Sequence, residues 1–114
     1  MTAKNEQAIQ NVANRMEPFA PTHPGVVLKE EIEYRGISQR RIAKEMGVLP
    51  TQLNEVLNGK RQLTTEYALL FEAVLNIAAE PLLEMQVRYN MIMAKRNKTL
   101  TDRLANIRKI AAVL

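Results

Sequence analysis

The sequence predicts an all-α fold in which five core helices carry one extra amphipathic helix at each end. Apolar residues recur at helical intervals of three and four along the chain, and no stretch shows the alternation of a half-buried strand. Proline, glycine, serine and threonine separate these stretches, where helices begin and end. Hydrophobic residues make up 46% of the chain and aromatic residues only 4%, so aliphatic side chains would fill the single core of one domain.

The first predicted helix occupies residues 1–21, and its apolar stripe has spacings of three, four and three. The stripe consists of Ile9, Val12, Met16 and Phe19. Pro18 and Pro21 end this helix, because proline removes a backbone donor and clashes with the preceding turn. The second helix opens within residues 22–25 and runs to Gly36. Its expected apolar side consists of Val26, Val27, Leu28, Ile32 and Tyr34.

The next stretch, SQRRIAKEMGVLPTQLNEVLNGKR (38–61), predicts a helix-turn-helix. Ser38 is a good N-cap for a short helix, and Gly47 accepts the left-handed turn that ends it. Pro50 suits the first position of a second helix, where its missing N–H costs nothing. The inward-facing residues of the two helices are Ile42, Ala43 and Met46, then Leu53, Val56 and Leu57. Ala43 is small enough to let the two helices cross closely, and Val48 anchors the turn.

Two core helices and one terminal helix follow the motif. Thr64 or Thr65 caps a helix whose expected inner residues are Ala68, Leu69, Phe71, Ala73, Val74 and Leu75. A further helix starts near Pro81 and reads through Leu82, Leu83, Met85, Val87, Tyr89 and Met91. A break at 97–99 precedes a last stripe of Leu100, Leu104, Ile107, Ala111 and Leu114. We therefore expect three parts: residues 1–21, 22–97 and 98–114.

The core of a domain of this size does not require the two terminal helices. Each has an apolar stripe that could pack on the core, pair across a dimer or receive a partner protein. The sequence leaves these three alternatives open.

Composition argues against catalysis, metal binding and secretion. The chain has no cysteine, so a disulfide framework and a zinc–cysteine site are ruled out. The one histidine, His23, stands beside proline and glycine at a helix start, which favours a structural role. The sequence has no apolar run near the ~18 residues of a membrane span and no signal-peptide core at its start. We expect a non-enzymatic cytoplasmic protein without cofactor or metal.

Charge is distributed unevenly along the chain. Residues 38–61 contain five bases and two acids, residues 62–84 contain four acids, and residues 85–114 contain seven bases and one acid. A basic motif beside an acidic segment indicates a nucleic-acid-binding face. For the bases near the C-terminus, a solvated helix face is an equally good explanation.

The second helix of the motif would read DNA in the major groove, chiefly near its N-terminus. With its apolar residues turned inward, the outward positions are Pro50, Thr51, Gln52, Asn54, Glu55 and Asn58. Asn and Gln can pair with adenine through two hydrogen bonds, and Thr can contact a base or a thymine methyl group. We therefore predict base contacts from Thr51, Gln52, Asn54 and Glu55. Glu55 would repel phosphates unless it meets a cytosine amino group or an arginine.

Over about residues 22–90 the chain resembles the HigA antitoxins, a group within the XRE/Cro-type repressors. The resemblance is carried by THPG near residue 22, GISQ (36–39), LNGKR (57–61) and MQVRY (85–89). It implies a lambda-repressor-like five-helix domain in which Gln39 holds the DNA backbone. Arg40, Arg41, Asn58, Lys60 and Arg61 would supply further backbone contacts.

The resemblance also implies partners. A HigA-type antitoxin would bind a HigB/RelE-like ribonuclease toxin directly and repress the shared operon as a homodimer on palindromic double-stranded DNA. The dimer contacts would then lie after the fourth core helix, at Leu82, Leu83, Val87 and Tyr89.

The sequence departs from its relatives at Leu49-Pro50, where they usually carry polar residues. Leu49 cannot cap a helix and Pro50 cannot donate a hydrogen bond to a base, so base readout would be narrower here. Two alternatives to the antitoxin remain. One is a stand-alone dimeric XRE-family repressor without a toxin, and the other is a protein-interaction module that has lost DNA binding.

Overall fold

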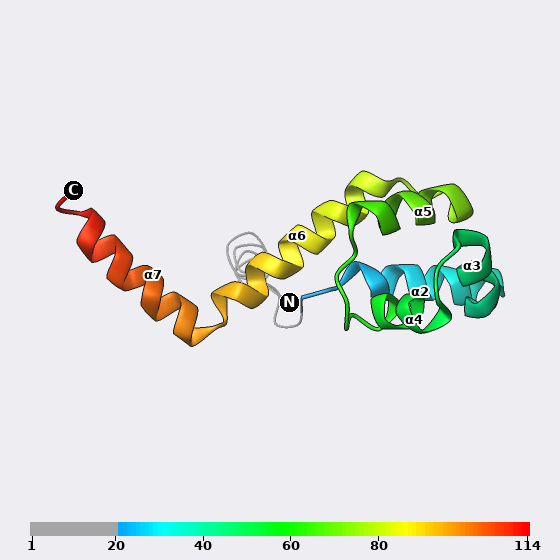
Figure 1. The fold of residues 1–114 in the computed structure, drawn as a ribbon, viewed down its shortest axis with the longest axis horizontal. Helices are drawn as coiled ribbons and strands as arrows, with labels where there is room; N and C mark the ends of the chain where they lie inside the picture. Colours follow the sequence, from blue (N-terminus) through cyan, green and yellow to red (C-terminus); the bar gives the residue numbers. More distant parts are fainter. Residues whose placement is uncertain (1–20) are drawn as a thin grey trace, which may run out of the picture. The chain divides into compact units, whose positions relative to one another are not determined.

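The computed structural model describes residues 21–114, so the predicted helix over 1–21, with Ile9, Val12, Met16 and Phe19, lies outside the described residues. Within this part the chain forms helices and no strand, which confirms the all-α fold (Figure 1). The helices are α2 (Pro24–Arg35), α3 (Gln39–Met46), α4 (Pro50–Leu57), α5 (Thr65–Leu75), α6 (Ala79–Lys95) and α7 (Lys98–Ala111). No helix of this part is both long enough and apolar enough to cross a membrane.

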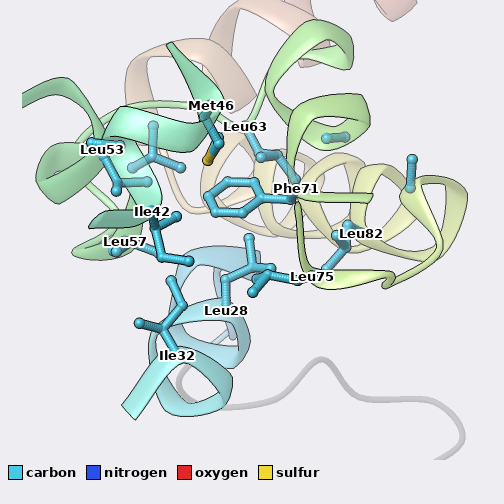
Figure 2. Close-up of a cluster of buried hydrophobic side chains, with 14 residues drawn as sticks. Leu28, Ile32, Ile42, Met46, Leu53, Leu57, Leu63, Phe71, Leu75 and Leu82 are labelled. Carbon is cyan, nitrogen blue, oxygen red and sulfur yellow. The ribbon is translucent and has the colours of Figure 1, made fainter. Parts of the chain in front are cut away.

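Residues Thr22–Met91 form one compact unit that contains the predicted core. α2 and α4 lie side by side, and α3 contacts both α4 and α5 (Figure 1). Figure 2 shows the ring of Phe71 from α5 among side chains of α3 and α5, with Leu28 and Ile32 of α2 below it. Because α2, α3 and α4 each contribute apolar side chains to this one cluster, the orientation of α4 is determined by the core itself.

The helix ends follow local capping chemistry. The Ser38 hydroxyl accepts a hydrogen bond from the Arg41 N–H at 3.1 Å, and the Thr64 hydroxyl accepts one from the Tyr67 N–H at 3.2 Å. Gly47 ends α3 with φ of 71°. These contacts confirm both predicted caps and the glycine turn of the motif.

His23 has the structural role that the sequence predicts. Its Nδ1 accepts a hydrogen bond from the Gly25 N–H at 2.9 Å and so caps α2. Its ring meets the Tyr89 ring edge-on, with 5.1 Å between the ring centroids. His23 is 4% exposed. Because it caps α2 and contacts Tyr89 of α6, it connects the start of α2 to α6.

Several expected core positions are wrong. Tyr34 is 89% exposed, and Val26, Val27, Leu69 and Ala73 are exposed as well. In α2 and α5 the buried apolar side chains occupy a narrower stripe than the sequence suggested. They are Leu28 and Ile32 in α2, and Ala68, Phe71 and Leu75 in α5. Tyr34 lies two positions after Ile32, a rotation of about 200° that turns it to the opposite face.

The chain from Ile92 onward belongs to a second unit. The side chain of Asn97 accepts a hydrogen bond from the Leu100 N–H at 3.1 Å and caps α7, which confirms the predicted break. α7 has no buried residue, and its apolar side chains Leu104, Ile107 and Ile110 are exposed.

Candidate nucleic-acid interface

The candidate interface is the solvent side of α4. Leu53, Val56 and Leu57 are buried in the core, as predicted. The opposite side carries Pro50, Thr51, Asn54 and Asn58, which are exposed, with Gln52 and Glu55 half-buried beside them. One side of this helix is therefore committed to the core, and the other presents hydroxyl and amide groups to the outside.

The start of α4 lacks a side-chain cap. Leu49 occupies the N-cap position with extended backbone, makes no side-chain cap hydrogen bond, and is 61% exposed. Pro50 follows at the first position of the helix. This confirms that Leu49 does not cap α4 and places an apolar pair at the end of the helix where bases would be read.

A chain of side-chain hydrogen bonds crosses the candidate interface. The Asn54 Nδ2 donates to Gln39 Oε1 at 3.1 Å, and the Asn58 Nδ2 donates to Asn54 Oδ1 at 3.1 Å and to the Asn54 main-chain oxygen at 2.9 Å. Lys29 Nζ donates to Asn58 Oδ1 at 3.0 Å. Three predicted site residues are thus brought together, and Lys29 of α2 joins them although the sequence analysis gave it no role.

Tyr67 is a second residue that the sequence analysis missed. Its hydroxyl donates a hydrogen bond to Gln52 Oε1 at 3.3 Å. Burial, as the largest cause, raises the pKa of Tyr67 above its ordinary value, so the hydroxyl keeps the proton that this bond requires. The Gln52 oxygen therefore faces Tyr67 and keeps one lone pair, while its NH2 group is left for an outside acceptor.

Glu55 forms an ion pair with Arg61, with 3.0 Å between Glu55 Oε1 and Arg61 Nη2. This arginine offsets the repulsion that Glu55 alone would exert on a phosphate. Both side chains are about half exposed, so the pair contributes little to stability. Arg40, Arg41 and Lys60 are exposed. An open hollow is lined by Gln39 of α3 and by Pro50, Thr51, Asn54 and Glu55 of α4.

α6 supports the loop after α4. The buried Gln86 side chain accepts a hydrogen bond from the Leu63 N–H at 2.8 Å and donates to Asn90 Oδ1 at 2.9 Å. Asn90 in turn donates to Gln62 Oε1 at 3.3 Å. This network holds the segment next to Lys60 and Arg61. A glutamine inside an apolar helical stripe was the only signal in the sequence that could have indicated it.

The four predicted dimer residues differ in their surroundings. Leu82 is buried in the core, and Leu83 packs against that core. Tyr89 is half-buried and meets the His23 ring. Val87 is 60% exposed and is the member of the set that faces solvent.

Comparison with known proteins places the chain in a family. The sequence profile of the helix-turn-helix family matches residues 28–82. Virulence-associated protein I of Dichelobacter nodosus is 34% identical over 77 residues, which are 67% of this chain and 71% of that protein. The chain belongs to the helix-turn-helix family, in its XRE-type branch.

Solved structures of antitoxins resemble this chain. An addiction-module antidote protein of the HigA family from Coxiella burnetii is 28% identical, with a TM-score of 0.64 over 80% of this chain and 95% of the other. The antitoxin HigA of Pseudomonas aeruginosa, solved with the higBA promoter, is 21% identical and shares the fold, with a TM-score of 0.60 over 83% and 96% of the two chains. The resemblance to HigA-type proteins that the sequence motifs indicate is confirmed.

Proposed function

We propose that this protein is the antitoxin of a toxin–antitoxin pair and that it represses its own operon by binding promoter DNA through α4. The observation that carries the proposal is the solvent side of α4, where Thr51, Asn54 and Asn58 stand opposite a fully buried stripe. The likeness to the HigA antidote protein of Coxiella supports the antitoxin assignment. The P. aeruginosa HigA with the same fold was solved with promoter DNA, which supports DNA binding.

In this proposal α4 enters the major groove and its amide and hydroxyl groups contact base edges. Asn54 and Gln52 would donate to or accept from bases, and Thr51 would contact a base or a thymine methyl group. Pro50 and Leu49 would contribute only apolar contact. Glu55 is paired with Arg61 and would reach a cytosine amino group only by leaving that pair.

Backbone contacts would surround this reading face. Gln39 lies at the start of α3, where its amide nitrogen and the helix N-terminus suit a phosphate. Arg40, Arg41, Lys60 and Arg61 would add contacts on either side. Asn58, also predicted as a backbone contact, uses its amide donors on Asn54 and would reach a phosphate only by leaving that partner. Such contacts position the protein without reading sequence and make binding fall steeply with salt.

The proposed protein partner is a HigB/RelE-like ribonuclease toxin, which the antitoxin would neutralise by direct binding. The proposed assembly on DNA is a homodimer, because one recognition helix reads few base pairs and a two-fold dimer matches a palindrome. Among the predicted dimer residues, Val87 is the one exposed for such a contact.

Co-expression with the product of the adjacent gene tests the antitoxin assignment. A neighbour that arrests growth alone, is silenced by this protein and co-purifies with it is the expected result. If the neighbour is harmless and nothing co-purifies, while the protein still binds its upstream DNA, the stand-alone dimeric repressor is the correct reading.

A gel shift with the protein's own upstream DNA tests the assignment of α4. The Thr51→Ala, Asn54→Ala double variant should lose sequence selectivity, because both side chains are exposed on the reading side. A matched control is Thr65→Ala, which removes an exposed threonine at the start of α5. Unchanged selectivity in the double variant would show that α4 is not the reading helix, and no binding by the parent would favour a protein-interaction module.

A further inference from the structure

The hydrogen-bond chain from Lys29 to Gln39 links three helices through groups of different chemistry. Lys29 lies in α2, Asn54 and Asn58 lie in or directly after α4, and Gln39 opens α3. The three amides each carry a donor end and an acceptor end, so each could be turned either way. The lysine ammonium differs from them, because it only donates.

Lys29 at one end of Asn58 and the Asn54 main-chain oxygen at the other together fix the direction of the whole chain. Because the Lys29 ammonium donates to Asn58, the Asn58 oxygen must face Lys29 and the Asn58 nitrogen must face Asn54. The main-chain oxygen of Asn54, which only accepts, requires the same orientation of Asn58. The Asn54 oxygen then faces Asn58, and the Asn54 nitrogen faces the Gln39 oxygen. The Gln39 NH2 group is left for an outside acceptor such as a phosphate.

This fixed direction has a consequence for the base that Asn54 would select. With one hydrogen bond made at each end, the Asn54 amide retains one N–H and one oxygen lone pair. Adenine offers the matching pair in the major groove, an acceptor at N7 and a donor at N6. Guanine offers two acceptors, so one of them would face the Asn54 oxygen. An amide able to turn or swing away would discriminate less well.

We propose that Lys29 and Asn58 are positioning residues for base readout, which fix the Asn54 amide in the direction that selects adenine. This inference rests on the proposed DNA-binding function. Lys29 acts through Asn58 and needs no contact with DNA. A simple phosphate contact by Lys29 is the competing explanation, and it predicts a different measurement. Loss of a phosphate contact weakens binding to all sequences alike and lowers the salt slope by about one, whereas loss of positioning lowers the preference for one base.

The experiment begins with the operator selected by the parent protein from a library of random duplexes. Dissociation constants are then measured for duplexes that carry each base pair at each position of the selected site. We expect one position at which adenine is preferred and at which Asn54→Ala removes the preference. At that position Asn58→Asp should lower the preference for adenine by about tenfold, the size of a lost two-bond contact. Lys29→Met should lower it by less, because Asn58 loses the anchor on its oxygen but keeps its bond to the Asn54 main chain.

Three variants besides Lys29→Met separate positioning from other roles. Lys29→Arg keeps a cationic donor and should retain most of the preference. Asn58→Asp keeps an acceptor for Lys29 but cannot donate to Asn54, so it should lose the preference despite its intact partner. Lys44→Met removes an exposed lysine of α3 that takes no part in this chain and should leave the preference unchanged.

Each outcome decides between explanations. If the parent selects no sequence, the proposed function fails. If the parent is selective but Lys29→Met and Asn58→Asp keep the full adenine preference, the positioning role is overturned while the proposed function stands. If Lys29→Met weakens binding to all duplexes equally and lowers the salt slope, the positioning role is also overturned, and Lys29 is a phosphate contact. Thermal unfolding of each variant shows whether it is folded. If Lys29→Met does not fold, the adenine preference of Asn58→Asp decides whether the chain has a positioning role.

Discussion

At the scale of single residues, His23 is a buried titratable group that also caps a helix. Its Nδ1 caps α2, and burial, the larger cause, lowers the pKa of His23 below its ordinary value, while the main chain of Arg61 acts in the opposite direction. Among the described residues, Nε2 makes no hydrogen bond. Protonation of this ring would place a charge in a buried site and would remove the acceptor that caps α2.

We therefore predict that folding stability falls as pH drops below about 6.5, the ordinary pKa of histidine. Because the folded pKa is lowered, the unfolded state binds more protons in this window, so stability is complete above it and is lost on acidification. The measurement is the midpoint of urea unfolding between pH 7.5 and 5.5. His23→Asn, which keeps a capping acceptor but does not titrate, should flatten this dependence. An equally steep dependence in that variant would assign the effect to other groups.

Gly25 is fixed by close packing between helices. A Cβ atom at this position would overlap the main-chain oxygen of Val56 in α4 and approach His23. Gly25→Ala should therefore destabilise the protein by about 1–3 kcal/mol through overpacking, as measured by urea unfolding. Gly36→Ala gives a useful comparison, because no atom lies near its Cβ and any loss there comes from its φ of 69° alone. A harmless Gly25→Ala would contradict the close contact of α2 with α4.

The outward positions of α4 could be predicted residue by residue, but their partners could not. Helical periodicity alone separates Asn54 from Leu53 and Val56. The contacts of Asn58 with Lys29 and of Gln52 with Tyr67 depend on how α4 crosses α2 and approaches α5, and spacing along the chain does not encode those crossings. From the sequence, Glu55 could face DNA only if a cytosine amino group or an arginine offset its charge. In the structure Arg61 forms that ion pair.

At the scale of elements, α2–α7 were predictable because each has its own start and stop signals. The structure confirms that Ser38 and Gly47 cap the two ends of α3 and that the helix break predicted at 97–99 falls where Asn97 caps α7. These signals depend only on residues close in the sequence. The inner faces were less predictable, since an apolar residue such as Leu69 or Tyr34 need not be buried. Burial depends on which neighbour covers the residue, and that is a property of the assembled fold.

α4 is the element in which a single substitution should add stability. Its N-cap, Leu49, makes no side-chain hydrogen bond to the first turn. Leu49→Ser would supply an oxygen acceptor for an N–H of the first turn, and we expect a gain of about 1 kcal/mol in the free energy of unfolding. Leu49→Ala, which shortens the side chain without adding an acceptor, is the control and should not show the gain. Equal unfolding midpoints for the two variants would count against a missing cap.

At the scale of the whole molecule, the proposed repressor needs a second copy, and the resemblance to HigA antitoxins predicts that the two copies meet through α6. Leu82 and Leu83 are occupied by the protomer's own core, whereas Val87 is exposed. Glu84 and Arg88 are exposed neighbours of Val87 with opposite charges. An antiparallel pairing of two such helices would place each of these charges opposite its complement, so this part of α6 can match a second copy of itself.

We predict that Val87→Glu converts the protein to a monomer, because a carboxylate from each copy would lose its water where an apolar contact is expected. Sedimentation equilibrium measures the dimer constant directly. Leu69→Glu places the same charge on a comparably exposed apolar position of α5 and should stay dimeric. On DNA, Val87→Glu should lose most of its affinity for the full palindrome and keep that for a half-site, since each recognition helix is intact. A dimer that survives Val87→Glu but dissociates with Leu69→Glu would move the two-fold contact from α6 to α5.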